Sequence, residues 1–220
     1  YRGWENGMDV VMRDAMTDND YSWMAVTGYQ QVGNGTVNPQ NVTIGNGGRV
    51  FSYTQIRKYN SFLENIEGMT IDAALKEKLK SEVRFLRAYD YFLKAMFFGD
   101  MPLITKTTPS TELPSRTPVA QIHTFILDEL DKISKILPVQ NNITAKGHVT
   151  RGSALALKAR LELYLGKYAD AMASSKAVID MGVYELYPNY EQLFYRQNKA
   201  NNKEAIAEIQ HIQNDYATSI

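Results

Sequence analysis

Aromatic rings alternate with carboxamides and carboxylates in one glycine-rich stretch near the beginning of the chain, "DNDYSWMAVTGYQQVGNG", residues 18–35. A flat aromatic ring can cover the apolar C–H face of a sugar, and nearby amides and acids can hydrogen-bond its hydroxyl groups. Such sites are mostly formed before the ligand arrives. The stretch therefore has the composition of a carbohydrate-binding surface, and the candidate residues to contact such a ligand are Trp23, Tyr21, Tyr29, Gln30 and Asn34.

The same stretch also has purely structural interpretations. Trp23 could fill the base of the loop as a core residue. Asp18, Asn19 and Asp20 carry oxygen atoms that suit a hard cation such as calcium. They lack the spacing of an EF-hand, so a solvated turn is the favoured interpretation, and the sequence predicts neither a metal site nor a cofactor.

No arrangement of residues in the sequence indicates catalysis. His123, His148 and His211 lie far apart, and the H-E-x-x-H, G-x-S-x-G and Walker motifs are absent. The "GNGT" and "GNGG" stretches lack the strand–turn–helix context of a phosphate-binding loop and are interpreted as turns. A glycosidase needs two carboxylates at a defined separation, and the sequence singles out no such pair. We therefore expect no catalytic residue and no enzyme activity.

The charge balance and the lengths of the apolar stretches limit the kinds of molecule that the protein can be expected to bind. The 220 residues include 24 basic and 24 acidic side chains, whereas a nucleic-acid-binding protein normally carries a basic excess. No stretch reaches the roughly 18 uncharged residues that a membrane helix needs. Cysteine is absent, which excludes disulfides and thiol chemistry but indicates no compartment. We expect a folded domain without a nucleic-acid partner.

Apolar residues recur at intervals of three, four and seven along the segments that would have to position the loop. This period predicts amphipathic helices. The predicted helices cover residues 50–66, 71–98, 118–137, 150–165 and 167–181. The residues expected on their apolar, inward faces include Phe62, Leu75, Met96, Tyr164, Tyr168, Met172, Ser175 and Ile179.

The expected helix ends follow from capping residues. Thr70 is a candidate N-cap for the helix 71–98, which Gly99 would end. Thr117 is a candidate cap for the next helix, with Pro118 at its first position. The helix 71–98 has apolar residues on most of its circumference, so we expect a central core helix. Charged residues near its middle and end exclude a membrane span.

Residues 150–181 predict an antiparallel helix pair. Only Gly166 and Lys167 separate the two helices, so the chain must fold back on itself. Small residues at Ala159 and Ala171 allow a close approach, in a pattern similar to that of a tetratricopeptide repeat. The predicted fold is mainly α, built from tetratricopeptide-like antiparallel helix pairs in an α-α superhelix. Irregular loops and little β structure accompany them, including a short strand in "EAIAEIQHI", residues 204–212.

Four separated blocks between residues 50 and 213 resemble one family. They are "KYNSFLENIEGM", "EVRFLRAYDYFLKAMFFGDMPLI", "RGSALALKARLELYLGKYADAMASSKAVIDMGVYELYPNYEQLF" and "NKEAIAEIQH". Their order is similar to that in SusD-like (RagB/SusD) proteins, above all Phe-Leu-Arg-Ala-Tyr followed by an aromatic run and Gly-Asp-x-Pro-Leu. Asp90 departs from the family pattern, which often has an uncharged residue there, and an ion pair with Arg87 would accommodate it.

The resemblance implies a surface lipoprotein of Bacteroidetes-type bacteria that binds glycans, or sometimes peptides, outside the outer membrane. Such a protein performs no chemistry and delivers its ligand to a TonB-dependent transporter. The resemblance also implies a ligand-contacting aromatic residue in the irregular region before the helix 50–66. We assign this role first to Trp23 and second to Tyr21, and we expect residues 17–49 on the ligand face. The aromatic cluster Tyr184, Tyr187, Tyr190, Phe194 and Tyr195 is interpreted as structural packing.

A complete member of the family carries a signal peptide, a lipidated N-terminal cysteine and a long C-terminal half. The chain begins at "YRGWENGMDV" and ends at "HIQNDYATSI", so we expect both ends to be truncated. On this interpretation residues 1–220 form the N-terminal, tetratricopeptide-like part, and the membrane is reached only through a lipid anchor that this chain lacks. Two alternative functions stay open: a tetratricopeptide-type adaptor that binds a peptide, and a glycoside hydrolase.

Overall fold

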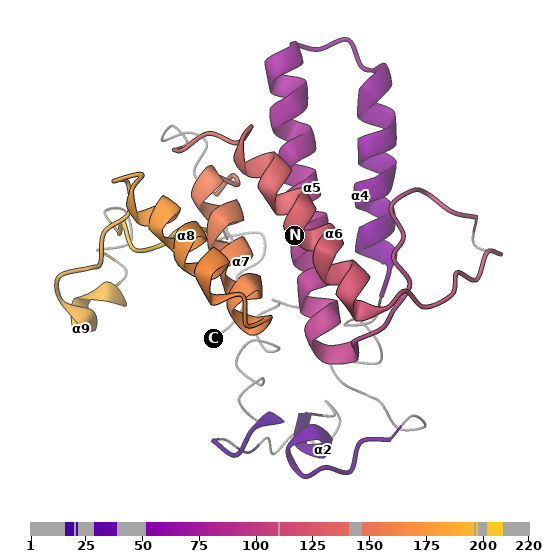
Figure 1. Cartoon of the computed structure of the whole chain (residues 1–220), viewed down its shortest axis with the longest axis horizontal. Coiled ribbons are helices and arrows are strands. Elements are labelled where there is room, and N and C mark those ends of the chain that lie inside the picture. Colours follow the sequence, from indigo (N-terminus) through magenta and orange to yellow (C-terminus); the bar gives the residue numbers. More distant parts are fainter. Residues whose placement is uncertain are drawn as a thin grey trace. The chain divides into compact units, whose positions relative to one another are not determined.

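The structure is a computed structural model that describes residues 16–19, 21, 29–38, 52–109, 111–140, 147–195, 197 and 202–208. The chain divides into two compact units, one formed by Tyr1–Gln55 with Gln210–Ile220 and the other by Ile56–Ile209. The helices of the described residues are labelled in Figure 1. Their bounds are α2 (Tyr29–Gly33), α4 (Thr54–Asn65), the 3₁₀ helix η3 (Ile66–Gly68), α5 (Ala73–Phe98), α6 (Val119–Ser134), α7 (Arg151–Tyr164), α8 (Tyr168–Ile179) and α9 (Tyr190–Leu193).

The predicted mainly helical fold is confirmed. Within the described residues the only β pairing is an isolated antiparallel bridge between Met101 and Thr117. The strand predicted for residues 204–212 is wrong for 204–208, which form bends and irregular chain, and the rest of it lies outside the described residues. No helix in the described part of the chain is long and apolar enough to cross a membrane.

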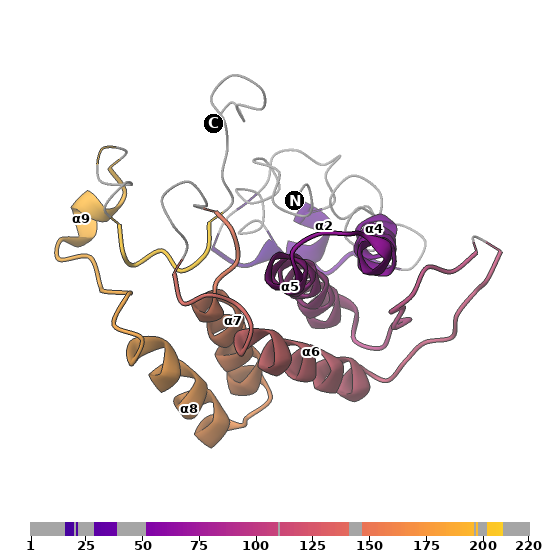
Figure 2. The same cartoon turned by 90° about the horizontal axis from the view of Figure 1, so that it is seen from above.

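In the second unit, consecutive helices pack on one another. α4 and α5 run alongside each other and are joined by the short connection through η3 (Figures 1 and 2). α6 packs against both α5 and α7, and α7 packs against α8. The helix α5 therefore packs against α6 and, more weakly, α7. Its buried side includes Phe85, Ala88 and Phe92 as the apolar pattern predicted, but the predicted row of leucines along α5 is only half-buried or exposed.

α5 begins and ends at residues whose backbone chemistry explains both positions. The N-cap is Asp72, whose Oδ1 accepts a hydrogen bond from the backbone N–H of Leu75 at 2.8 Å. The prediction of Thr70 as N-cap is wrong, since the first helical residue is Ala73. Gly99 ends the helix at φ 63°, a left-handed conformation that glycine adopts without steric penalty.

α6 begins one residue later than predicted. Thr117 is not the cap, because its backbone pairs with Met101, and Pro118 occupies the N-cap position. Asp100 replaces the missing cap, since its Oδ1 accepts a hydrogen bond from the N–H of Val119 at 2.8 Å. A carboxylate at the end of α5 thus satisfies an N-terminal amide of α6 and fixes the connection between the two helices.

α7 and α8 form the predicted helix pair. Thr150 and Ser153 make a reciprocal capping box at the beginning of α7. The chain turns at Gly166, where φ is 70°, and α8 begins at Tyr168. The tight turn returns α8 along α7, and the two helices pack closely.

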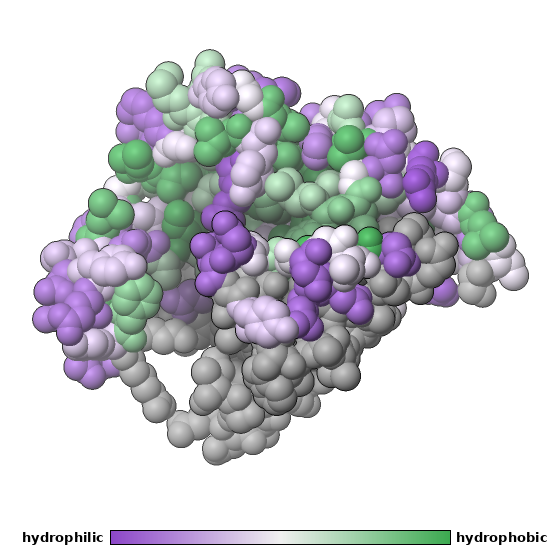
Figure 3. All heavy atoms as spheres, turned by 90° about the horizontal axis from the view of Figure 1, so that it is seen from below, coloured by the Kyte–Doolittle hydropathy of each residue, from purple (hydrophilic) through white to green (hydrophobic). Residues whose placement is uncertain are grey.

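The burial pattern corrects several sequence predictions. Ala171, Ser174 and Val178 form the buried side of α8, whereas Tyr168 and Met172, predicted to face inward, are exposed. The aromatic cluster after α8 was predicted to be packed, and this is wrong for Tyr190, Phe194 and Tyr195, whose side chains are exposed. Residues of the predicted inner faces that are exposed are Phe62, Leu75, Met96, Tyr164, Tyr168, Met172, Ser175, Ile179, Tyr190, Phe194 and Tyr195. In the space-filling view, hydrophobic residues accordingly lie at the surface beside hydrophilic ones (Figure 3).

Candidate functional site

The structure brings two of the predicted ligand residues into contact. Tyr21 is 70 % exposed, and its hydroxyl accepts a hydrogen bond from the side-chain amide of Gln30, which lies in α2. An exposed phenol ring with a carboxamide at its polar edge combines the two kinds of contact that a sugar requires. Because the amide holds the hydroxyl, the ring has fewer orientations to lose when a ligand binds.

Asn34 follows α2 in a turn that holds its side chain. Its Oδ1 accepts hydrogen bonds from the backbone N–H of Thr36 at 3.2 Å and from the Thr36 hydroxyl at 2.6 Å. Gly35, between them, has φ 70° and supplies the left-handed residue that the turn requires. Asn34 is exposed and belongs to the same unit as Tyr21 and Gln30.

The remaining predicted ligand residues are not described to the same extent. Trp23 lies outside the described residues, so its assignment stays a prediction. Tyr29 is the first residue of α2, but its side chain is outside what the structure describes. In the proposed cation turn, the backbone N–H of Asn19 donates to Thr17 Oγ1 at 3.1 Å. The described residues contain no group of three or more His, Cys, Asp or Glu side chains that could hold a metal ion.

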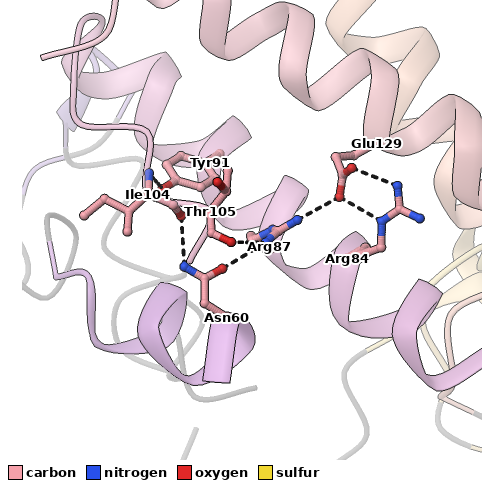
Figure 4. A network of polar contacts seen from close by, with 7 residues as sticks. All are labelled: Asn60, Arg84, Arg87, Tyr91, Ile104, Thr105 and Glu129. Carbon is pink, nitrogen blue, oxygen red and sulfur yellow. Dashed lines mark hydrogen bonds and ion pairs between the residues drawn. The ribbon is translucent and has the colours of Figure 1, made fainter. Parts of the chain in front are cut away.

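A second group of polar residues lies inside the helical unit and was missed by the sequence analysis. Glu129 of α6 accepts hydrogen bonds from Arg84 Nε at 2.9 Å and Nη2 at 2.8 Å, and from Arg87 Nη2 at 3.0 Å (Figure 4). Arg87 and Glu129 are buried, and the Arg87 guanidinium carbon lies 5.4 Å from the centre of the Phe125 ring. This ion-pair cluster joins α5 to α6.

The cluster continues to the backbone of the segment that follows α5. Arg87 Nη1 donates to Asn60 Oδ1 at 2.9 Å and to the Thr105 carbonyl at 3.2 Å. Asn60 Nδ2 donates to the carbonyls of Ile104 and Lys106, both at 3.0 Å. A buried amide and a buried guanidinium therefore donate hydrogen bonds to three consecutive backbone carbonyls. Figure 4 shows the bonds to Ile104 and Thr105.

Two further side chains fasten the same segment. Tyr91 Oη accepts from the N–H of Ile104 at 2.7 Å and donates to its carbonyl at 3.1 Å. Glu64 of α4 accepts from the N–H of Thr107 at 2.7 Å and from its hydroxyl at 2.5 Å. The segment is thus held by side chains of α4 and α5 although it has no regular structure. This arrangement positions backbone and leaves no acid, base or nucleophile poised for catalysis.

Comparison with known proteins decides the family. A family model described as "Starch-binding associating with outer membrane", of the SusD-like group, matches residues 5–165, more than half of this chain. The chain belongs to the SusD-like family. The starch-binding protein SusD of Bacteroides thetaiotaomicron is 31 % identical over 159 residues, which are 70 % of this chain and 28 % of that protein.

Solved SusD-like structures agree in fold. A SusD-like carbohydrate-binding protein of Bacteroides fragilis superposes with a TM-score of 0.87 at 24 % identity, covering 96 % of this chain and 42 % of that one. A laminarin-binding SusD-like protein gives a TM-score of 0.79 at 28 % identity, covering 86 % of this chain and 42 % of that one. This chain spans less than half of the length of each of these relatives.

One buried ion pair distinguishes this SusD-like chain from the expected pattern. Asp90 does not pair with Arg87, as its spacing had suggested, but with Lys94, whose Nζ lies 2.6 Å from Asp90 Oδ1. Both side chains are almost completely buried. Asp90 Oδ2 and the nearby Tyr59 hydroxyl are buried without a hydrogen-bond partner among the described residues. Burial raises the pKa of Asp90 above its ordinary value, although the Lys94 charge and hydrogen bond oppose the shift.

The buried Arg87 and Glu129 of this SusD-like protein had a signal in the sequence. Glu129 stands three residues after Ile126 and four before Ile133, both fully buried, so it lies at the edge of the apolar stripe of α6. A carboxylate in that position requires a cation from a neighbouring helix. Arg84 and Arg87 occupy the facing helix, but the contact between α5 and α6 could not be read from periodicity alone.

Proposed function

We propose that this chain binds an oligosaccharide non-catalytically at the bacterial cell surface, as the N-terminal, tetratricopeptide-like part of a SusD-like protein. The observation that carries the proposal is the exposed Tyr21 ring held by Gln30, in a chain whose family model is described as starch-binding. The laminarin-binding SusD-like relative supports a glycan as the ligand class. Residues 17–49 form the ligand face in this proposal.

Each proposed ligand residue has a chemical role. The ring of Tyr21, with that of Trp23, covers the apolar face of a pyranose, and Tyr29 adds a third ring. Gln30 orients the Tyr21 hydroxyl and offers its amide to a sugar hydroxyl. Asn34, held by Thr36, presents its carboxamide in a fixed direction. No bond is made or broken, so the ligand leaves unchanged.

The family suggests the cellular setting. The SusD-like model is described as associating with the outer membrane. We propose that the whole protein is held at the outer membrane by an N-terminal lipid and passes its glycan to a TonB-dependent transporter.

The proposal is tested by measuring binding of this chain to an array of oligosaccharides and peptides while following release of reducing sugar. Trp23→Ala and Tyr21→Ala should each weaken binding of the selected oligosaccharide by about 1 kcal/mol, because each removes a stacking surface. Tyr21→Phe keeps the ring and should have the smaller effect.

Tyr168→Ala is the matched control, because Tyr168 of α8 is 71 % exposed and Tyr21 is 70 % exposed. Unchanged sugar affinity in both Trp23→Ala and Tyr21→Ala would refute the site. Binding of peptides alone would favour the adaptor function. Release of reducing sugar would favour a hydrolase.

A further inference from the structure

Asn34 and Gly35 form an exposed Asn-Gly pair directly after α2. Within the described residues no other asparagine is followed by glycine. Asparagine is a chemically labile side chain, because a backbone nitrogen can attack its amide carbon. Glycine at the next position leaves that nitrogen unshielded, since it has no side chain.

The turn holds the Asn34 side chain in a hydrogen-bonded ring with the next two residues. Thr36 donates two hydrogen bonds to Asn34 Oδ1, from its backbone N–H at 3.2 Å and its hydroxyl at 2.6 Å. The backbone bond closes an Asx turn, a ring that contains both the Asn34 Cγ and the Gly35 nitrogen. Both bonds also draw electron density from the amide carbonyl, which makes Cγ more electrophilic. A side chain built at Gly35 would meet no heavy atom within 4 Å, so the site is open to water.

We propose that Asn34 is a site of spontaneous deamidation. The Gly35 amide proton passes to solvent base, the Gly35 nitrogen bonds to Asn34 Cγ, and the Cγ–Nδ2 bond breaks as Nδ2 takes a proton from solvent and leaves as ammonia. Water then adds across either carbon–nitrogen bond of the cyclic imide and opens it to aspartate or isoaspartate. The sequence of steps involves no oxidant or reductant and requires only water.

One contact opposes the reaction and sets its rate. The Gly35 N–H donates to the Val32 carbonyl at 3.1 Å, and this bond must open before the nitrogen can attack. α2 has only five residues, and helices of that length are marginal by themselves. Opening of this one bond at the end of α2 therefore needs little free energy, and the reaction proceeds once it has opened while Thr36 still holds the Asn34 side chain.

The modification would change the proposed ligand face. It converts a neutral carboxamide into a carboxylate, and the isoaspartate product also lengthens the backbone inside the turn held by Thr36. The deamidation itself does not depend on the proposed function, because its covalent product is measured whether or not a sugar binds.

The experiment incubates the chain at mildly alkaline pH and follows each asparagine by proteolysis and mass spectrometry, with fragmentation that distinguishes aspartate from isoaspartate. Asn34 should convert several-fold faster than the exposed Asn65 and Asn189, which Ile66 and Tyr190 follow. Gly35→Ala should slow the conversion by shielding the nitrogen.

A synthetic peptide of residues 29–38 serves as the positive control for the chemistry. Thr36→Val retains the backbone donor and removes the hydroxyl, so it should slow conversion in the chain if the hydroxyl polarises the amide. Retention of the Asn34 amide in the chain while the peptide converts would overturn the proposal. So would conversion of Asn65 and Asn189 at the same rate as Asn34.

Discussion

Arg87 of α5 and Glu129 of α6 are buried partners, with 3.0 Å between Nη2 and Oε2 and only 8 % and 9 % of the two side chains exposed. The same carboxylate accepts two hydrogen bonds from Arg84, so two guanidiniums of one helix share a single acid of the next. The pairing fixes the register of α5 against α6, because the three side chains meet only in one alignment of the helices. Through Asn60 it also holds the segment that leaves α5.

Glu129→Gln should destabilise the fold by roughly 3 kcal/mol, because it leaves two desolvated guanidiniums without a countercharge. Urea denaturation, followed by circular dichroism, measures the change. Asp131→Asn is the control, since Asp131 pairs with Lys135 and Lys158 but its side chain is 44 % exposed, and such exposed pairs contribute about 1 kcal/mol or less each. Equal losses in the two variants would contradict a special role for the buried cluster.

The pH dependence of stability should carry the signature of Glu129. Burial acts to raise the pKa of this carboxyl, but the hydrogen bonds and charges of Arg84 and Arg87 outweigh burial and hold the pKa below its ordinary value of 4.5. The folded state therefore keeps the charge at a pH where the unfolded chain is protonated. This contribution is fully present above pH 4.5 and is lost as the pH falls through the lower, folded-state pKa.

Asp90 affects the pH dependence in the opposite direction, because burial raises its pKa. Its contribution to stability is fully present below the ordinary pKa of 3.8 and is lost as the pH rises through the folded-state pKa.

Comparing the wild type with Glu129→Gln isolates the Glu129 contribution to this pH dependence. The difference in urea midpoint between the two proteins should shrink on acidification through the region below pH 4.5. A difference that stays constant would show that Glu129 titrates alike in both states.

Periodicity predicted the helices well, because burial of an apolar stripe is a local property of the sequence. It located α5, α6 and the α7–α8 pair to within a few residues, and Gly99 and Gly166 at their turns. Their caps were less predictable. Asp100 serves α6 from the end of α5, and that contact exists only once the chain has folded.

The candidate site was predictable in composition but not in contacts. The pairing of Tyr21 with Gln30 spans nine residues, and no local rule specifies it. The ion pairs show the same limit: spacing suggested Arg87 with Asp90, whereas Glu129 from another helix takes Arg87 and leaves Asp90 to Lys94. Exposure of Met172 and Tyr168 on α8 was missed because an apolar residue at helical spacing does not reveal which side has a neighbour.

The Asp90–Lys94 pair should contribute little net stability despite its short distance. Desolvating two charges largely offsets their attraction, and Asp90 Oδ2 has no hydrogen-bond partner in the described portion of the protein. Asp90→Leu with Lys94→Met should be as stable as the wild type or more stable by about 1 kcal/mol. Asp90→Leu alone should lose roughly 3 kcal/mol, because Lys94 then stays buried without a countercharge. Thermal and urea unfolding of the single and double variants measures both values.

Two outcomes would contradict this view of the pair. If the double variant were less stable than Asp90→Leu alone, the two charges would stabilise the core beyond their mutual interaction. A single variant as stable as the wild type would show that Lys94 reaches water when its partner is removed. Tyr59→Phe tests the surroundings of the pair. It removes a buried hydroxyl that has no hydrogen-bond partner in the part of the chain that the structure describes, so it should leave stability unchanged or raise it.

Gly152, near the beginning of α7, allows Tyr184 to approach the helix backbone. A Cβ at position 152 would lie 2.3 Å from the Tyr184 hydroxyl and about as close to its ring, which is too near for any real contact. Tyr184 is held there because its hydroxyl is 3.0 Å from Thr150 Oγ1, in the capping box of the same helix. Gly152→Ala should therefore lose about 1–3 kcal/mol by displacing the ring, although alanine is the better helix former.

A double-mutant cycle separates the steric effect from a general effect on α7. Tyr184→Ala removes both the ring and its hydrogen bond, so Gly152→Ala added to it should no longer destabilise and should gain a few tenths of a kcal/mol from helix propensity. Ala154→Gly, two residues later in the same helix, provides the opposite substitution at a buried position that Tyr184 does not limit. If Gly152→Ala destabilised the Tyr184→Ala variant as much as it destabilises the wild type, Gly152 would be required for a reason other than the approach of Tyr184.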